Sequence, residues 1–207
     1  MVRNVPKLRF KEFSGEWESN RIGDITKLTD GMHFTPTYVE SGIPFWSIET
    51  VVSNVSPKYI TNEEHENAIK RCKPQKNDIL LTRIGTLAKV KLIDWNDEFS
   101  IYVSLALIKS STSFNSMFAK FYFETEYYKK DFLSKSLLTA VPSKINMEDL
   151  RQTIIKLPSL QEQEKIASFL SLIDDKINLQ SEKVKYLKDY KKGLMQKIFS
   201  RKLRFKD

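Results

Sequence analysis

The chain has 207 residues, with 34 Lys and Arg against 26 Asp and Glu and a formal net charge of +8. A hydrophobic content of 41% supports a folded core and excludes a wholly disordered chain. No stretch is apolar over the ~18 residues that a membrane span needs, and the first residues lack the apolar run of a secretory signal. The single cysteine, Cys72, excludes an internal disulfide and a multi-cysteine zinc site. We therefore expect a cytoplasmic protein with an anionic partner, nucleic acid ahead of a membrane surface.

The composition changes at Pro158. All seven prolines and five of the six glycines lie at or before this residue, and a continuous polar–apolar pattern follows it. Proline and glycine interrupt regular elements, so their absence favours one uninterrupted helix. We expect a globular domain within residues 1–158, a long helix over 159–200 and a short end segment, 201–207.

In chain order, the globular part combines β-rich segments with one helical segment. The predicted strands cover residues 43–52, 78–84, 86–94 and 100–110. Residues 114–133 predict a helix with Ser113 as its N-cap. Residues expected on one face are Ile101, Val103, Leu105 and Leu107 in the last strand and Phe118, Phe121 and Tyr122 in the helix. The mixture indicates an α+β domain.

The predicted helix after Pro158 has two signatures. Ser159 to Glu162 has the pattern of a capping box, in which the serine hydroxyl accepts from the N–H of Glu162 and the carboxylate bonds back. Beyond it, core positions recur at alternating steps of four and three residues, as in the seam of a coiled coil. The seam is Ile166, Leu170, Ile173, Ile177, Gln180, Val184, Leu187, Lys191, Leu194 and Ile198. A rod of ~40 residues is roughly 60 Å long and needs a partner helix to cover such a seam.

Charge along this helix favours an antiparallel partner. Residues 159–182 carry a net charge of −3 (five acids, two lysines), and residues 183–206 carry +9 (ten Lys/Arg, one Asp). In an antiparallel pair, the half with a net charge of −3 would lie beside the +9 half of the other helix at both ends. In a parallel pair, the two +9 halves would lie beside each other and repel. The predicted fold class is therefore an α+β domain followed by one long helix in an antiparallel two-helix coiled coil. The alternative is that the charges only complement the helix dipole, which acts over the terminal turns.

The chain also repeats a short motif. Residues 7–12, Lys-Leu-Arg-Phe-Lys-Glu, return as residues 202–207, Lys-Leu-Arg-Phe-Lys-Asp. Such a repeat is expected of one unit of a protein that is duplicated head to tail.

Together these features resemble the specificity subunits of type I restriction–modification enzymes. Residues 5–10 and 15–18 are similar to the usual start of that family, and residues 30–45 and 78–85 resemble its target recognition domain. The junction over residues 155–174, which contains Leu-Pro-Ser-Leu-Gln-Glu-Gln-Glu-Lys-Ile-Ala, resembles its spacer helix. Members usually carry two recognition domains and two spacer helices, and this chain has one of each. It is therefore expected to be a natural half-subunit or one half of a longer protein.

The resemblance implies that the domain reads one half of a split DNA sequence and that antiparallel spacer helices set the distance between the halves. It also implies that the chain is not an enzyme. Methyltransferase subunits and a restriction/translocase subunit would perform the chemistry and use S-adenosylmethionine, ATP and Mg²⁺, while this chain holds no cofactor and no metal. Its partners would be double-stranded DNA, those subunits and a second copy of itself.

The sequence offers few catalytic motifs. It lacks the Asn-Pro-Pro or Asp-Pro-Pro motif of an adenine methyltransferase, a glycine-rich cofactor loop and a P-loop. The segment 63–66, Glu-Glu-His-Glu, which includes His65, predicts a solvated charged surface rather than a metal site. Asp94, Asp97 and Glu98 predict a turn; the competing hypothesis is a metal-dependent nuclease that uses Asp94 and Asp97. A third hypothesis is a coiled-coil interaction protein that binds no DNA.

Polar and basic residues on three predicted loops are the candidate DNA contacts. Arg and Asn are the usual readers of base edges, and Lys mostly binds phosphate. We therefore predict base reading by Arg83 and Asn146, and phosphate contacts by Lys89, Lys91 and Lys144. The other candidates on the same loops are His33, Thr35, Thr37, Tyr38, Thr82 and Ser143.

Overall fold

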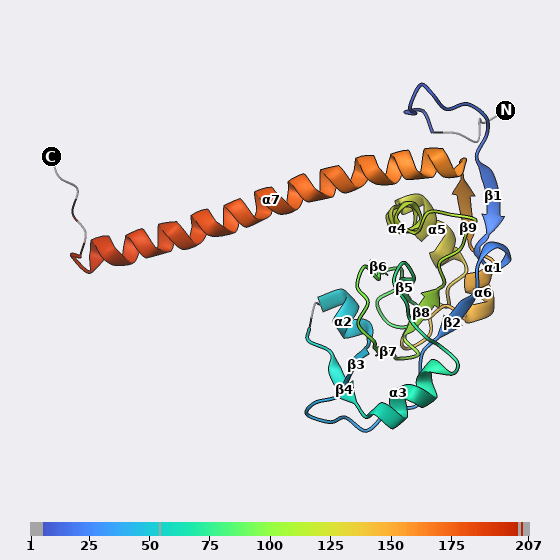
Figure 1. The fold of residues 1–207 in the computed structure, drawn as a ribbon, viewed down its shortest axis with the longest axis horizontal. Helices are drawn as coiled ribbons and strands as arrows, with labels where there is room; N and C mark the ends of the chain where they lie inside the picture. The colour runs from blue at the N-terminus through green and yellow to red at the C-terminus, as the bar shows by residue number, and fades with distance from the viewer. Residues whose placement is uncertain (1–5, 54, 203, 205–207) are drawn as a thin grey trace. The chain divides into compact units, whose positions relative to one another are not determined.

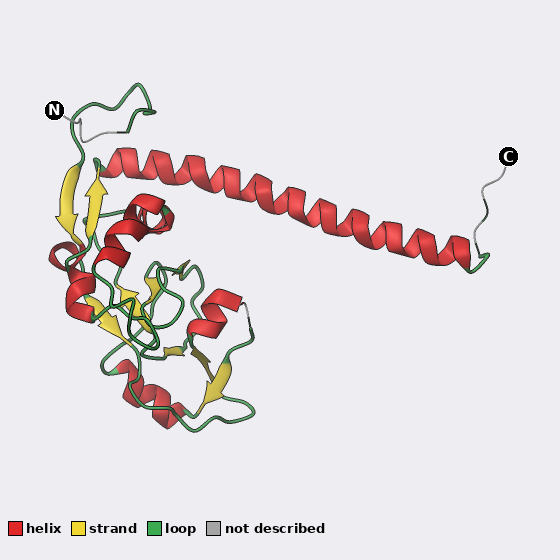
Figure 2. Cartoon of the chain, turned by 180° about the vertical axis from the view of Figure 1, so that it is seen from behind, coloured by secondary structure: helices red, strands yellow, loops and turns green. Residues whose placement is uncertain are grey.

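The computed structural model describes residues 6–53, 55–202 and 204. The chain divides into two compact units, the first reaching Ala167 and the second beginning at Ser168. The first unit combines short strands with short helices, and the second is helical (Figures 1 and 2).

Strands and helices are interspersed along the first unit, and α7 is the last element. The strands are β1 (Glu18–Arg21), β2 (Leu28–Asp30), β3 (Ile43–Trp46), β4 (Lys58–Ile60), β5 (Ile79–Thr82), β6 (Val90–Leu92), β7 (Ser100–Ile101), β8 (Leu105–Ile108) and β9 (Ile154–Leu157). The helices are α1 (Ile22–Ile25), α2 (Ile48–Ser53), α3 (Asn62–Ile69), α4 (Ser116–Glu124), α5 (Glu126–Ser134), α6 (Met147–Arg151) and α7 (Leu160–Phe199).

Three small sheets organise the first unit. The four-stranded sheet has the order β2-β8-β5-β6, with antiparallel neighbours throughout. The three-stranded sheet has the order β4-β3-β7, in which β3 is antiparallel to β4 and parallel to β7. β1 pairs antiparallel with β9, so residues 18–21 lie beside residues 154–157. The start of the domain is therefore bound to the strand that leads into α7.

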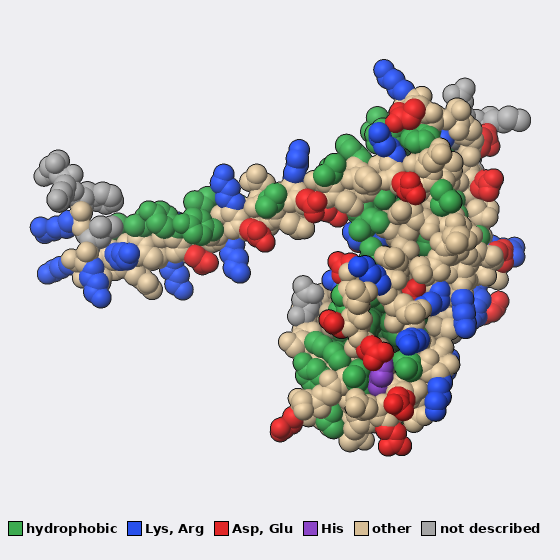
Figure 3. All heavy atoms as spheres, in the orientation of Figure 1, with side chains coloured by type: hydrophobic (Ala, Val, Ile, Leu, Met, Phe, Trp, Pro, Cys, Tyr) green, Lys and Arg blue, Asp and Glu red, His purple; other side chains and the backbone are tan. Residues whose placement is uncertain are grey.

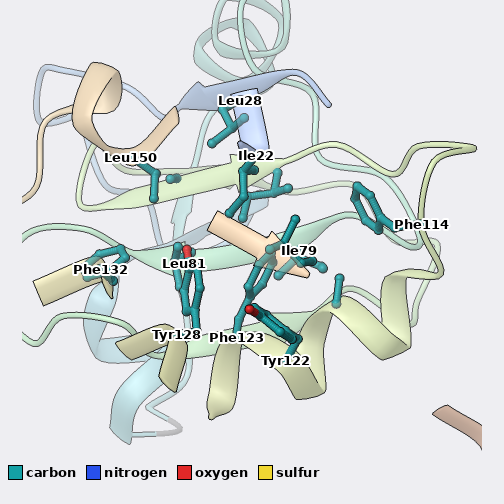
Figure 4. Close-up of a cluster of buried hydrophobic side chains, with 14 of the residues drawn as sticks. Ile22, Leu28, Ile79, Leu81, Phe114, Tyr122, Phe123, Tyr128, Phe132 and Leu150 are labelled. Atoms are coloured by element: carbon teal, nitrogen blue, oxygen red, sulfur yellow. The ribbon is translucent and has the colours of Figure 1, made fainter. Parts of the chain in front are cut away.

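The core lies on both faces of the four-stranded sheet, and β8 is buried at every position. Ala106 and Ile108 of β8 join the larger apolar cluster, which also contains aromatic side chains of α4 and α5 (Figure 4). Leu105 and Leu107 join a second cluster together with Ile101. Burial of both faces explains why this strand has no polar position.

The predicted strands are longer than the observed ones. The segment 43–52 is a strand only to Trp46, and helix α2 follows it. The segment 86–94 is a strand only from Val90, because the preceding turn contains Ala88 with a φ of 59°. The segment 100–110 is two strands, since Val103 leaves the ladder and its N–H donates to the Met32 carbonyl at 2.9 Å. Alternating apolar residues indicated β structure correctly but did not reveal these turns.

The predicted helix over residues 114–133 is two helices, α4 and α5, with a break at Thr125. The Thr125 hydroxyl accepts from the N–H of Tyr128 at 3.2 Å and so caps the second helix. The N-cap of α4 is Asn115 rather than the predicted Ser113, because the Asn115 side chain accepts from the Phe118 N–H at 2.9 Å. Phe118 and Tyr122 are buried as expected, whereas Phe121 is half-buried under the Lys120 ammonium, 4.3 Å from the ring centre.

Helix α7 is continuous from Leu160 to Phe199, so an α+β domain followed by one long helix is confirmed. The Ser159 hydroxyl caps it by accepting from the Glu162 N–H at 3.3 Å. The predicted return bond of the capping box is wrong, because the Glu162 carboxylate accepts two hydrogen bonds from Arg9, each of 2.7 Å. Pairing of α7 with another helix stays a prediction, and the end segment 201–207 lies largely outside the described residues. In the described part of the chain, no helix has the length and apolar character to cross a membrane.

Two glycines give a matched test of this packing. A Cβ at Gly31 would lie 2.0 Å from the Ile101 carbonyl oxygen, whereas a Cβ at Gly193 on α7 would meet nothing within 4 Å. We expect Gly31→Ala to lower the free energy of unfolding by at least about 2 kcal/mol through overpacking. Gly193→Ala should raise helix stability by up to about 1 kcal/mol. Urea unfolding followed by circular dichroism checks both, and equal stability of the two variants would contradict the packing.

Candidate nucleic-acid interface

Three loops of the first unit are joined at their bases. They cover residues 31–38 after β2, residues 83–89 after β5, and residues 137–146 between α5 and α6. The joining hydrogen bonds are Val103 N–H to Met32 O (2.9 Å), Arg83 N–H to Ser104 O (2.9 Å), Gly85 N–H to Ser143 O (2.8 Å) and Ile145 N–H to Arg83 O (2.9 Å). We call these three loops the loop surface. The structure thus brings together the three segments that the sequence offered as separate candidates.

One buried carboxylate, Asp30 at the end of β2, connects the bases of these loops. Its side chain is 4% exposed. Its Oδ2 lies 3.3 Å from Nη1 of Arg83 and 3.0 Å from Nε2 of His33, and its Oδ1 contacts Nη2 of Arg71. A carboxylate withdrawn from water needs such partners, since an unpaired buried charge is strongly destabilising. Asp30 therefore fixes the first loop relative to the second.

The structure places Arg83, a predicted base reader, at the base of the second loop. This residue is only 7% exposed, and its guanidinium donates to the carbonyls of Val103 at 2.9 Å and Ile145 at 3.3 Å besides facing Asp30. Burial lowers the pKa of the Arg83 guanidinium, and the Asp30 charge opposes that shift. Because its donors are used inside the domain, Arg83 is a structural residue of the loop surface.

Two exposed lysines, Lys89 in the second loop and Lys91 on β6, and a buried threonine at the end of β5 lie at this turn. Thr82 is fully buried, and its hydroxyl accepts from the Lys89 N–H at 2.9 Å, so it closes the turn. Gly85 has a φ of 84°, a conformation that side chains rarely adopt, and it lies exposed. Lys89 and Lys91 are exposed, and the Lys91 ammonium lies 5.8 Å from the ring centre of Trp95. Both lysines are free to meet phosphate.

The first loop exposes polar and aromatic side chains. The His33 side chain is 53% exposed although one ring nitrogen faces Asp30. Thr35, Thr37 and Tyr38 are also exposed, and the Lys58 ammonium lies 4.3 Å from the Tyr38 ring centre. Phe34, which sequence reasoning passed over, is 60% exposed.

In the third loop, Asn146 is exposed and donates to the Asp149 carboxylate at 3.1 Å. It precedes α6 without a capping bond from its side chain, so the amide is held only by that exposed contact. Lys144 and Ser143 are half-buried, and the Ser143 hydroxyl donates to the Leu138 carbonyl at 3.0 Å. Val141 is fully exposed at the tip.

In the charged segment 63–66, Glu63 and Glu66 are exposed as predicted, whereas His65 is not. His65 lies on α3 and is buried, with Nδ1 2.9 Å from the Ser100 hydroxyl and Nε2 3.8 Å from the exposed Glu98 carboxylate. It links α3 to β7 and is not part of a solvated surface. Asp94 and Asp97 are exposed on the loop between β6 and β7. Within the described residues, no three His, Cys, Asp or Glu side chains gather closely enough to hold a metal.

The second unit presents two apolar stripes along α7. Every described position of the seam in this unit is at least partly exposed: Ile173, Val184, Leu187 and Ile177 are 39% to 56% exposed, and Leu170, Leu194 and Ile198 are half-buried. A further stripe lies roughly a third of a turn away from the seam. This outer stripe consists of Phe169, Leu172, Leu179, Tyr186 and Tyr190, and the last two rings stack at 6.3 Å. Figure 3 shows apolar side chains along the helix and basic ones gathering toward its far end.

Sequence reasoning missed the residues that support the loop surface. Asp30 and Arg71 lie 41 positions apart, and no local pattern pairs them. Phe34 lies in a candidate loop but carries no polar group, so a search for hydrogen-bonding side chains overlooked it.

The outer stripe of α7 was also missed. It could have been found from the seven-residue spacing of Leu172, Leu179 and Tyr186.

Comparison with known proteins gives consistent matches. The family model described as type I restriction modification DNA specificity domain matches residues 14–189. Two relatives from Methanocaldococcus jannaschii are similar: the putative type I restriction enzyme MjaX specificity subunit (26% identity, 96% of this chain, 49% of the relative) and the type I restriction enzyme MjaVIII specificity subunit (27%, 93% and 45%). The S subunit of a type I restriction–modification system from M. genitalium shares the fold, with a TM-score of 0.65, 16% identity and coverage of 97% of this chain and 49% of that one. The chain therefore spans about half the length of the curated relatives that it matches.

Asp30→Asn tests the support of the loop surface. Removing the charge leaves the buried Arg83 guanidinium without its counter-ion, and we expect a loss of about 3 kcal/mol in the free energy of unfolding. The exposed Asp24→Asn is the control and should change this free energy by less than about 0.5 kcal/mol. Urea unfolding followed by tryptophan fluorescence measures both variants. Equal stability would mean that Asp30 does not carry the ion pairs described above.

Proposed function

Because the chain belongs to the type I restriction modification DNA specificity family, we propose that its first unit binds one half of a two-part DNA sequence. The observation that carries this proposal is the family match over residues 14–189, which includes all three loops and most of α7. A single recognition unit with a single long helix suits the reading of one half-site. We assign methylation and cleavage to partner subunits, which would bind S-adenosylmethionine, ATP and Mg²⁺.

Side chains of the loop surface and of the adjoining strand β6, some exposed and some half-buried, suit contact with DNA. Lys89, Lys91 and Lys144 would neutralise phosphates, which contribute most of the affinity and none of the sequence information. Asn146 would read a base edge, because its amide offers a donor and an acceptor together. The remaining base and sugar contacts would come from the first and third loops, through His33, Thr35, Thr37, Tyr38 and Ser143. The net charge of +8 supports attraction to the duplex.

The seam of α7 would pair with the same helix of a second copy. Apolar stripes of this length are seldom left in water by soluble proteins. The unlike charges of the two helix halves, −3 and +9, favour the antiparallel direction. A two-fold axis across the pair would then present two recognition units to one DNA molecule.

The outer stripe would dock a methyltransferase subunit, on which a restriction/translocase subunit could then assemble. Leu179 and Tyr186 are 65% and 67% exposed and lie outside the seam, so pairing through the seam leaves them available. Exposed tyrosines and leucines in a row suit a helical partner, since aromatic anchors dominate many interfaces.

Leu187→Asp tests the pairing, because it sets an unpaired charge in the middle of the seam. We expect the mass measured by light scattering at micromolar concentration to fall to half of the wild-type value. Gln196→Asp adds the same charge on the opposite face of α7 and should leave the mass unchanged. A wild-type chain that is already monomeric would reject the pairing.

Mapping of methylated sites tests DNA reading in a complex of this chain with methyltransferase subunits. Two identical recognition units should select a split palindrome, that is, a word, unspecified bases and its reverse complement. Asn146→Ala should alter the same position in both half-words, whereas Lys89→Ala should weaken all sites alike and reduce the salt slope of binding by about one. Lys11→Ala, which removes an exposed charge outside the loop surface, should change neither.

Three results, one from this mapping and two from the purified chain, would contradict parts of the proposal. Two unrelated half-words would mean that the chain works beside a different half rather than with its own copy. A purified chain that cleaves DNA with Mg²⁺ through Asp94 and Asp97, or that does not compete for DNA at any salt concentration, would reject recognition by a non-catalytic subunit.

A further inference from the structure

The N-terminal segment is held on the first turns of α7 by a forked ion pair. Nε and Nη2 of Arg9 donate to the two carboxylate oxygens of Glu162, each at 2.7 Å. The Glu162 side chain is 1% exposed, so this bond is shielded from water and is stronger than a surface ion pair. The remaining donors of Arg9 bind the carbonyls of Ser14 and Gly15 at 3.2 and 2.7 Å. We call residues 7–12 the clamp and residues 159–167 the helix head.

Two further clamp residues contact one lysine of the helix head. Glu12 lies 3.4 Å from the Lys165 ammonium, and the same ammonium lies 5.5 Å from the ring centre of Phe10. Leu8, in contrast, is 90% exposed. The clamp therefore recognises the spacing from Glu162 to Lys165 through an arginine, an aromatic ring and an acid.

The motif at 202–207 keeps each of these three residue types in the same order. Arg204 corresponds to Arg9, Phe205 to Phe10 and Asp207 to Glu12. Residues 203 and 205–207 lie outside the described part of the chain, so this correspondence rests on the sequence. Among the described residues there is one helix head, and the clamp at residues 7–12 occupies it.

We propose that residues 202–207 are a second clamp and that they bind the helix head of another copy of this chain. This inference rests on the antiparallel pairing proposed above. If the ten seam positions pair end to end, Ile166 faces Ile198 of the second copy, because each a position then meets a d position. The same register sets residue 202 opposite residue 162, at the site where Arg9 binds.

Exchange of clamps follows from the chemistry of this carboxylate. Both Glu162 oxygens are engaged by Arg9, so Arg204 of the second copy would replace Arg9 rather than add to it. A hollow of about 470 Å³ beside the ion pair, lined by Arg9, Ser159, Leu160 and Gln163 among others, leaves room for an incoming chain. Pairing would then release the N-terminal segment of each copy from its own helix head.

A peptide of residues 200–207 tests this proposal on the full-length variant Arg9→Ala/Arg204→Ala, which lacks both arginines. We expect the peptide to shift the amide resonances of the helix head in a saturable way and to raise the thermal midpoint of the variant. The same peptide with Arg204→Ala should do neither, and the wild-type chain should bind the peptide at least roughly tenfold more weakly because Arg9 competes. Equal effects of the two peptides, or no effect of either, would overturn the proposal.

A conservative pair keeps the test decisive if the alanine variant does not fold. Arg9→Lys/Arg204→Lys retains both charges but cannot form the forked contact, so the peptide should still bind at the helix head. The peptide is also added to a chain that carries both Leu187→Asp and Arg9→Lys, in which the seam should not pair. This measurement separates the second clamp from the pairing of α7. Peptide binding there supports the second clamp even if the seam proves unpaired, and its loss there overturns the clamp.

Discussion

The loop surface depends on the neutralisation of one buried carboxylate. Asp30 lies out of water at the end of β2 and is matched by Arg83 and by the more exposed Arg71 and His33. Because an unpaired charge in that position would be costly, the ion pairs hold loops from three parts of the chain at fixed relative positions. The side chains exposed beyond them make none of these ion pairs, so their replacement should leave the base of the loops intact. This arrangement is what a recognition scaffold requires, since one frame must support many different contact residues.

The junction with the long helix uses the same physical device. Glu162 is as deeply buried as Asp30, and its partner Arg9 comes from the other end of the domain, 153 residues away in sequence. The pairing of β1 with β9 also holds the two segments beside each other. The first turns of α7 therefore belong to the globular unit, while the rest of the helix is available for assembly.

The apolar surface of α7 explains why the chain would work as part of a complex. The seam and the outer stripe lie on different sides of the helix and are both exposed. A single partner helix covers only the seam, so the two stripes suit two kinds of neighbour. The basic far half of the helix would match the acidic near half of a second copy.

Local pattern in the sequence was sufficient for the long helix, the α+β character of the domain and the family. The uninterrupted spacing after Pro158 and the serine cap at Ser159 are local features that need no distant partner. Tertiary structure alone decided which polar residues remain available. Arg83 looks like a base reader in sequence and is buried against Asp30, Glu162 looks like half of a capping box and binds Arg9, and His65 looks solvated and lies against Ser100. In each case the partner that decides the role of the residue lies more than 30 residues away in sequence. A buried polar group without a partner is costly, so the fold must supply one. A local sequence pattern does not show which distant residue that partner is.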